Sequence, residues 1–370
     1  MIRRLTSSIL FCLVSFGAAA ETKLLNEAER RQIALEAISR LETDALSNPQ
    51  LQNALDKLLG QIRGTPDFVR LVKKFNLTGQ ENELLKIACA HPKGELGVEA
   101  IKVLLASADQ TLLGSALNSL NALVLVEVLG NAKDQRAVPL LLPLLGDSTR
   151  EIDLRRSAVR ALAQTQDGAN ELINLARTAK LGADLRLTAS EVLNRVRWPG
   201  IKAEAEQLLP LPRGRNAKAL PPIAELTRMA GNASKGEQLY FNEVLGCATC
   251  HQVRGRGVEI GPDLSEIGSK LGRDALLESI LDPNAGISFG YEAHQIELAS
   301  GDEAFGLLAS ETEEEIAIKD LQGIVSRFKK EEIRSRKQLS NSIMPTGLTE
   351  GLSAQELVDL VEYLATLRRE

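Results

Sequence analysis

The chain has 370 residues and a formal net charge of −5 at pH 7, with 44% hydrophobic but only 3% aromatic residues. This length is enough for two domains, and the richness in Leu and Ala favours helices. The sequence contains no concentrated basic face, which argues against a nucleic-acid-binding protein.

The first 20 residues have the pattern of a secretory signal peptide. Arg3 and Arg4 form a basic start, an apolar run follows at 9–16, and small residues at 18–20 provide a cleavage site. The apolar run is too short to span a bilayer. We therefore expect export to the periplasm, cleavage near Ala20 and no transmembrane segment in the mature chain. An uncleaved anchor is the alternative.

Residues 21–209 are expected to form a helical domain, because apolar residues recur at spacings of three and four. The stretch 154–162 is similar to 185–193, and each has a small residue in mid-helix flanked by Leu or Val. Small residues at such positions let a neighbouring helix pack closely. The region from 90 to 200 resembles HEAT or armadillo-like repeats, and an irregular helical bundle is the alternative.

A proline-rich segment at 210–222 ends the helical pattern. It carries four prolines, which cannot continue a helix. We interpret it as a linker and expect a second domain at 223–370. That domain is expected to begin with a short helix at 223–229, and Ser234 is expected to cap the next helix, which runs towards Leu245.

The run Cys247-Ala-Thr-Cys250-His251 is the signature of covalent c-type haem attachment. On one helical turn both sulfurs lie on one face, so they can form thioethers with a single porphyrin. His251 is then placed to bind the iron as an axial ligand. Half of a zinc site and a redox dithiol are the alternatives. Outside this run, the Cys and His residues of the expected mature chain are Cys89, His91 and His294.

The expected sixth iron ligand is Met344, in the loop Ser342-Ile-Met-Pro345 before the last helix. Pro345 would stiffen this loop, and histidine–methionine pairs are usual in cytochromes c. Core packing is the alternative role for Met344. His294 is the rival ligand, and is otherwise expected to be a surface residue or a haem-edge contact.

From residue 292 the apolar period changes to two, which predicts strands. The expected strands lie at 295–298, 304–310, 315–319 and 324–328. They form a small antiparallel insertion, at about 291–333, between His251 and Met344. The final helix is expected to start at Ser353, in a capping box with Glu356.

Residues 231–370 resemble the Pirellula/Verrucomicrobium-type haem-binding domain, a branch of the class I cytochrome c superfamily. The matching stretches are 236–240, 247–251, 261–268, 276–285, 290–291, 342–345 and 352–360, in the expected order. The resemblance implies haem binding, electron transfer and a β insertion. It also implies that the Pro262 carbonyl accepts the Nδ1 proton of His251 and that Leu264 packs on the porphyrin. An ordinary turn is the alternative for this run.

The expected protein is thus mainly α, with a HEAT/armadillo-like repeat domain followed by a class I cytochrome c domain. We expect a non-enzymatic cytochrome with one covalent haem c, which exchanges electrons with a partner protein docked on the repeats. Residues 231–370 contain 14 basic and 24 acidic residues, so the partner is expected to present a basic patch. A haem sensor with a displaceable Met344 is the alternative. A peroxidase would need an open site and distal acid–base groups.

Overall fold

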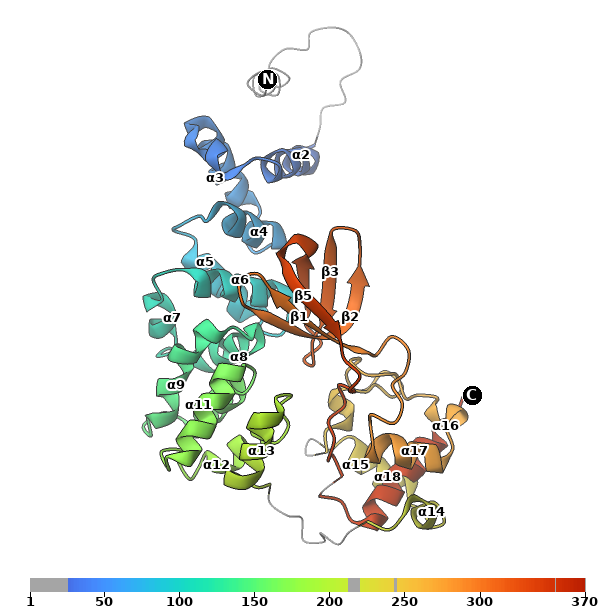
Figure 1. The fold of residues 1–370 in the computed structure, drawn as a ribbon. Coiled ribbons are helices and arrows are strands. Elements are labelled where there is room, and N and C mark those ends of the chain that lie inside the picture. Colours follow the sequence, from blue (N-terminus) through green and yellow to red (C-terminus); the bar gives the residue numbers. More distant parts are fainter. Residues whose placement is uncertain (1–25, 212–219, 243–244, 350, 370) are drawn as a thin grey trace, which may run out of the picture. The chain divides into compact units, whose positions relative to one another are not determined.

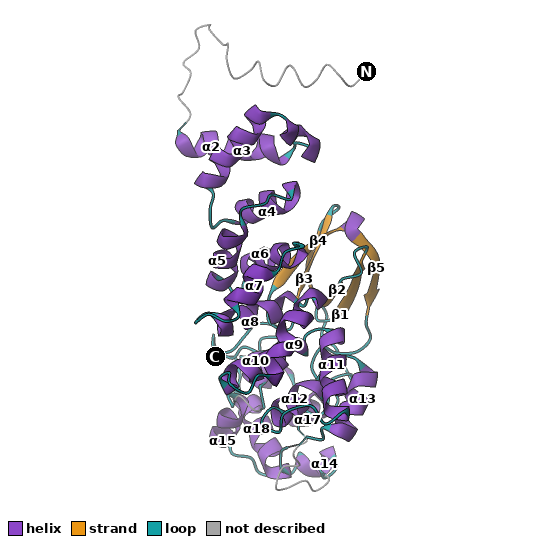
Figure 2. Cartoon of the chain, turned by 90° about the vertical axis from the view of Figure 1, so that its left-hand side faces the viewer, coloured by secondary structure: helices purple, strands orange, loops and turns teal. Residues whose placement is uncertain are grey.

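The chain is mainly helical and carries one antiparallel sheet (Figures 1 and 2). The computed structural model describes residues 26–211, 220–242, 245–349 and 351–369. The expected signal peptide and most of the expected linker lie outside these residues. The chain divides into two compact units between Leu77 and Thr78, earlier than the expected linker at 210–222.

The first unit consists of helices whose starts are fixed by side-chain caps. Its elements are α2 (Glu27–Ser39), η1 (Thr43–Ser47), α3 (Pro49–Gln61) and α4 (Pro66–Phe75). Asn26 caps α2 and Thr65 caps α4, because each side chain accepts a hydrogen bond from a backbone N–H of the first turn. Leu55, Phe68 and Leu71 are among the buried side chains of this unit.

The second unit begins with a series of packed helices. They are α5 (Glu81–Ala90), α6 (Glu95–Ala106), α7 (Thr111–Ala116), α8 (Ala122–Ala132), η2 (Gln135–Ala137), α9 (Val138–Gly146), α10 (Ile152–Leu162), α11 (Gln166–Arg177), α12 (Arg186–Leu193) and α13 (Pro199–Leu208). Helices α8 and α10 meet at small residues, since a Cβ on Gly130 would lie 2.8 Å from the Cβ of Ala161. This is the close packing expected from the small residues of 154–162.

A second group of helices follows the proline-rich segment. It contains α14 (Ile223–Leu226), α15 (Ala233–Tyr240), η3 (Cys247–Thr249), α16 (Ile267–Lys270), α17 (Arg273–Leu281) and α18 (Ala354–Thr366). The predicted capping box of Ser353 and Glu356 is confirmed at the start of α18. The predicted cap of α15 is wrong: Asn232, not Ser234, accepts the hydrogen bond from the N–H of Lys235.

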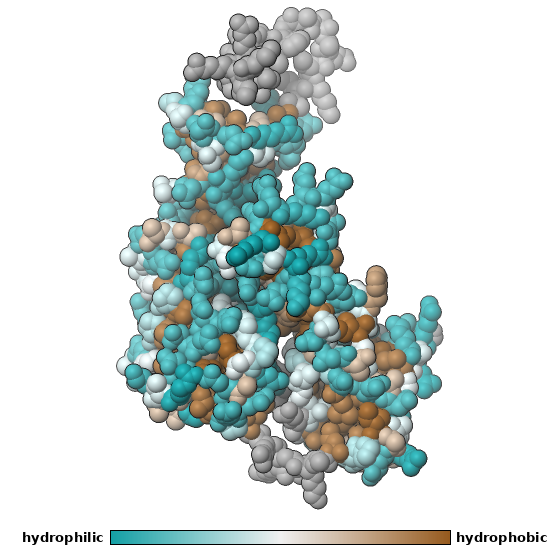
Figure 3. Space-filling view, viewed as in Figure 1, coloured by the Kyte–Doolittle hydropathy of each residue, from teal (hydrophilic) through white to brown (hydrophobic). Residues whose placement is uncertain are grey.

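Helices α15 and α18 cross in close contact and carry the core of this group. A Cβ on Gly236 would collide with the backbone carbonyl of Asp359. The core contains Leu226, Tyr240, Leu276, Leu357 and Val361, among others. Figure 3 shows hydrophobic side chains reaching the surface over α15, α17 and α18. No helix in the described part of the chain is both long and apolar enough to cross a membrane.

The sheet inserted before α18 has five strands rather than the four expected. The strands are β1 (Ala293–Leu298), β2 (Glu303–Glu311), β3 (Glu315–Lys319), β4 (Val325–Lys329) and β5 (Ile333–Gln338), with η4 (Lys330–Glu332) before β5. Their order is β4-β3-β2-β1-β5, and every pairing is antiparallel. The four predicted strands correspond to β1–β4. The unpredicted β5 extends the insertion to Gln338.

Three ion pairs connect this sheet to the preceding helices. Lys133, just after α8, lies 2.9 Å from Asp320 in the β3–β4 turn. Arg197, between α12 and α13, lies 2.8 Å from Glu303 in β2. The third pair joins Arg327 in β4 to Glu95 in α6 at 3.4 Å. The sheet is therefore held against the helices by side chains from the β3–β4 turn and from strands β2 and β4.

Candidate functional site

The two cysteines of the Cys-x-x-Cys-His run lie on one short turn. Residues Cys247–Thr249 form the 3₁₀ helix η3, which starts after Gly246 at a φ of 75°. The backbone N–H groups of Cys250 and His251 both donate to the Cys247 carbonyl, at 3.2 and 2.9 Å. Residues three apart eclipse one another in a 3₁₀ helix. The turn thus gives Cys247 and Cys250 the same-side arrangement expected from sequence.

The His251 ring is oriented by a backbone carbonyl. Its Nδ1 lies 2.8 Å from the carbonyl oxygen of Pro262, as the resemblance implied. A carbonyl only accepts hydrogen bonds, so this contact places the proton on Nδ1 and leaves the lone pair on Nε2. Metal-binding histidines in proteins are commonly oriented by a bond of this kind. Nε2 is therefore the nitrogen that can bind a metal.

Gly261 makes room for that ring. A Cβ at this position would lie 2.5 Å from Cε1 and 2.8 Å from Nδ1 of His251. Both separations are shorter than a van der Waals contact, so a side chain would push the imidazole away from Pro262. The run Gly261-Pro262 thus supplies both the space for the ring and the acceptor that orients it.

Backbone hydrogen bonds hold the loop around His251 in place. The N–H groups of Ile260 and Gly261 donate to the Cys250 carbonyl at 3.0 and 2.7 Å. On the other side, the buried Tyr240 hydroxyl donates to the His251 carbonyl at 3.0 Å. Leu264 is half-buried and packs against the core shared by α15 and α18. These contacts bring five of the six predicted site residues into one compact loop.

Burial shifts the pKa values of the three titratable side chains Cys247, Cys250 and His251. Desolvation lowers the pKa of His251, and the hydrogen bond to Pro262 opposes that change. Neutral imidazole is the form that binds metals. Desolvation also raises the pKa of Cys247 to about 11 and raises the pKa of Cys250. Reactive dithiols have lowered thiol pKa values, so these cysteines differ from a redox dithiol.

The residues present fit a covalently attached haem. Two thiols share one turn, and the adjacent imidazole offers Nε2 from an apolar environment. Half-buried apolar residues of this region, including Ala248, Leu264, Ile267 and Leu281, pack against the adjoining hydrophobic core. Within the described ranges, no group of three or more His, Cys, Asp and Glu residues could hold a metal ion.

Met344 lies in the loop between β5 and α18, apart from the His251 loop. Its backbone N–H donates to Ser342 Oγ at 3.1 Å, and the Ser342 N–H donates to Asn284 Oδ1 at 2.8 Å. Met344 is half-buried and lines a cavity of about 840 Å³ together with Thr249, one of the two residues between the cysteines. Met344 and Thr249 therefore border the same cavity, while the His251 ring contacts Pro262, so the role of Met344 as a ligand stays a prediction.

His294 is buried, so its expected position at the surface is wrong. It lies in β1, which pairs with β2 on one side and β5 on the other, and only 6% of the residue is exposed. Arg336 Nε donates to its Nδ1 at 3.4 Å. Desolvation, followed by the charge of Arg336, lowers the pKa of His294.

Sequence reasoning missed Tyr240 and Asn284 as supports of the two loops. Tyr240 contacts a residue 11 positions away, and Asn284 one 58 positions away. Neither contact leaves a local pattern in the sequence. Both residues do lie in stretches that carry the family resemblance, and this was the available signal.

No curated protein matches the chain. A family model described as Cytochrome c matches residues 233–318. The matched segment includes the cysteine turn, His251, Pro262 and Leu264, and it ends before Met344. This match supports the cytochrome c superfamily, whose members bind haem c covalently and transfer electrons. Together with the geometry of the His251 loop, it shows that the chain carries a cytochrome c domain.

Proposed function

We propose that this protein is an exported c-type cytochrome with a single haem attached through Cys247 and Cys250. His251 and Met344 are its axial ligands, and it exchanges electrons with a partner protein rather than acting as an enzyme. The observation that carries this proposal is the His251 ring, which Pro262 orients and Gly261 accommodates. This geometry presents Nε2 in a fixed direction.

The protein residues provide attachment, orientation and exclusion of water. When bound, haem supplies an iron that gains or loses one electron. The Pro262 carbonyl keeps the proton on Nδ1, which makes the His251 ring more basic and prevents its rotation. The apolar side chains around the turn lower the local polarity, and a thioether ligand from Met344 raises the reduction potential.

Other features of the chain support a branch of the cytochrome c superfamily, a cellular compartment and a kind of partner protein. The five-stranded sheet between His251 and Met344 supports the Pirellula/Verrucomicrobium-type branch. The residues at 1–20 support export to the periplasm. We propose that the helices before 209 are HEAT-like repeats that help to dock a partner. The net charge of −10 over 231–370 favours a partner with a basic patch.

A haem-based sensor is the second candidate, and the position of Met344 favours it. Met344 is half-buried in a loop that lines an open cavity, so it can be displaced more easily than a core methionine. Displacement would open the iron to a small ligand.

The deciding experiment is the optical spectrum of protein expressed with a cytochrome c maturation system. We expect a low-spin c-type spectrum, a ferric methionine–iron charge-transfer band and no response to carbon monoxide. Ready binding of carbon monoxide would favour the sensor. Absence of covalent haem would contradict both candidates.

Replacement of Met344 by Leu tests the sixth ligand directly. This change conserves volume, so it should cost less than about 1.5 kcal/mol of stability. We expect the charge-transfer band to disappear, the reduction potential to fall and carbon monoxide to bind. Met229→Leu is the matched control, since Met229 packs against the α15–α18 core. If the two variants behave alike, Met344 is not a ligand.

A further inference from the structure

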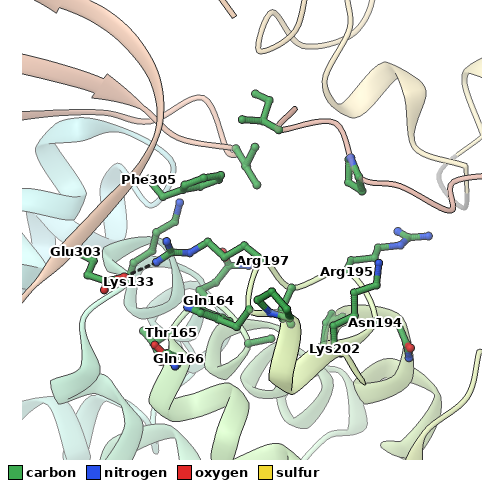
Figure 4. Close-up of a pocket in the computed structure, with 18 of the residues that line it drawn as sticks. Lys133, Gln164, Thr165, Gln166, Asn194, Arg195, Arg197, Lys202, Glu303 and Phe305 are labelled. Carbon is green, nitrogen blue, oxygen red and sulfur yellow. Dashed lines mark hydrogen bonds and ion pairs between the residues drawn. The ribbon is translucent and has the colours of Figure 1, made fainter. Parts of the chain in front are cut away.

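The cavity beside Met344 has the size of a ligand site. Its volume is about 840 Å³, and small-molecule sites generally occupy about 300–1,000 Å³. Figure 4 shows Asn194, Arg195 and Lys202 on one side of the cavity and Arg197 and Phe305 on the other. All of its walls belong to the second compact unit.

The walls of the cavity differ in charge. The helical wall carries more cations than acids: its charged residues are Lys133, Arg160, Arg195, Arg197, Lys202, Asp167 and Glu191. The wall formed by the Met344 loop has no charged side chain, and is made of Leu339, Asn341, Ser342, Ile343, Met344, Pro345 and Thr346. The cationic helical wall therefore shares the cavity with the uncharged and partly apolar wall of the Met344 loop.

Two of the cations are neutralised by carboxylates. Arg197 pairs with Glu303 and stacks on Phe305, with its guanidinium 5.0 Å from the ring centre. Lys133 pairs with Asp320. Lys202 differs, because its Nζ reaches only the Thr346 hydroxyl, at 3.4 Å, and it has no carboxylate partner among the described residues. Its charge remains available to an anion in the cavity.

Trp198 is the N-cap residue of α13 and has an extended backbone, and Lys202 lies in the first turn of that helix. The guanidinium of Arg197 lies over the Trp198 ring, 4.9 Å from its centre. Trp198 and Lys202 both line the cavity. An aromatic ring and an ammonium group thus line the same cavity as the apolar side chains of Ile343 and Pro345. This combination suits a ligand with a flat apolar body and one negative charge.

We propose that this cavity binds a small aromatic carboxylate. The carboxylate contacts Lys202, and the ring lies between Trp198 and the Met344 loop. Binding replaces the contact between Lys202 and Thr346, which is two residues after Met344, and so couples occupancy of the site to the position of that loop. The site itself does not depend on haem; only the link to the iron rests on the proposed function.

Calorimetric titration of the full-length protein tests the site with three probes. Phenylacetate should bind at least about tenfold more tightly than phenylacetamide, which has the same shape but no charge. Inorganic phosphate, which lacks an apolar body, should bind more weakly than phenylacetate. Equal affinity for phenylacetate and phenylacetamide, equal affinity for phosphate, or no binding of phenylacetate would each overturn the proposal.

Variants locate the binding site on the protein. Lys202→Gln should weaken phenylacetate binding about tenfold, the effect of one lost charged contact. Lys180→Gln is the control, because Lys180 is exposed and does not line the cavity. Trp198→Leu should weaken binding without removing the preference for the charged probe. Unchanged affinity in Lys202→Gln would overturn the proposal.

The link to the iron is measured separately on haem-loaded protein. Phenylacetate should shift the reduction potential of the wild type but not that of Lys202→Gln. A protein without covalent haem would contradict the proposed function and leave the calorimetric result intact. A loaded protein that binds phenylacetate with no shift would overturn the coupling.

Discussion

The orientation of His251 depends on a glycine, and this dependence can be tested at a single residue. Gly261→Ala adds a methyl group 2.5 Å from His251 Cε1, so the ring must leave the Pro262 carbonyl or the backbone must shift. Overpacking of this kind costs about 1–3 kcal/mol. We expect lower stability in denaturant and, in haem-loaded protein, a larger high-spin fraction in the spectrum.

Gly286→Ala provides the control for that experiment. A Cβ on Gly286 meets no atom within 4 Å. The control should keep the wild-type denaturation midpoint and spectrum. If Gly261→Ala also keeps them, the space around the His251 ring is not restrictive and the orienting role of Gly261 is wrong.

Single residues of the site were predictable to different degrees. The bond between His251 and Pro262 followed from a short motif, because the two residues belong to one loop. His294 was not predictable, because its burial requires strands on both sides of β1, and one of these strands, β5, is hidden in the sequence. Met344 was identified by its position before α18, but the sequence does not show the cavity that it lines.

At the scale of elements, β2 and β5 are joined across β1 by a charged network. Glu311 at the end of β2 accepts hydrogen bonds from Lys330 and Arg336, which lower its pKa to about 2 from the ordinary value of 4.5. A carboxyl with a lowered pKa in the folded state stabilises the protein above its unfolded pKa. This contribution is lost as the pH falls from about 4.5 towards about 2.

Glu311→Gln should therefore reduce the stability of the protein near neutral pH and flatten its dependence on pH below 4.5. The measurement is the thermal midpoint of wild type and variant between pH 2 and pH 6. The effect should be small, since Glu311 is exposed. Parallel pH profiles for the two proteins would show that this network does not contribute to acid sensitivity.

Strand β5 and the cap of α15 were missed for different physical reasons. Strand β5 reads Ile333-Arg-Ser-Arg-Lys-Gln338, lies at the edge of the sheet, and five of its six residues are exposed. An edge strand of this kind buries almost nothing and so lacks an apolar alternation. The sequence predicted Ser234 as the cap of α15, but the cap is Asn232, since either side chain can accept a hydrogen bond from the first turn. A contact distant in sequence favours Asn232, because the Asp359 carboxylate in α18 accepts a hydrogen bond from the Asn232 N–H at 2.8 Å.

At the scale of the whole molecule, the pair of Lys133 and Asp320 joins the helices to the sheet. Both side chains are largely buried, with 23% and 11% exposed. Burial lowers the pKa of Lys133, and the charge of Asp320 opposes this change. Asp320 also accepts hydrogen bonds from the N–H groups of Gln322 and Ile324, so it holds the β3–β4 turn as well.

Lys133→Met should cost about 1.5–3 kcal/mol, the usual loss for a hydrogen bond between charged groups. A double-mutant cycle with Asp320→Asn, measured by denaturant unfolding, isolates the pair. Arg327→Gln is the control, since Arg327 and Glu95 are both exposed and such pairs contribute about 0–1 kcal/mol. A coupling near zero would mean that other contacts hold the sheet.

The contacts between elements far apart in the chain were the feature least predictable from the sequence. The helical character, the cysteine turn and most strands follow from local patterns and short motifs. The cavity combines residues from 133–202 with the Met344 loop, and no repeat or motif connects these positions. Such contacts are decided by the packing of whole elements, which no local pattern encodes.

The two ends of the sheet insertion lie side by side, because the Leu339 N–H donates to the Ala293 carbonyl at 2.8 Å. The chain thus leaves the helical haem region and returns to it at nearly one point. An inserted segment with this closure can lengthen, shorten or be exchanged without moving the segments that flank it. The loops of His251 and Met344 can therefore keep their positions while the sheet between them diverges, so the insertion is the part of this domain most open to evolutionary change.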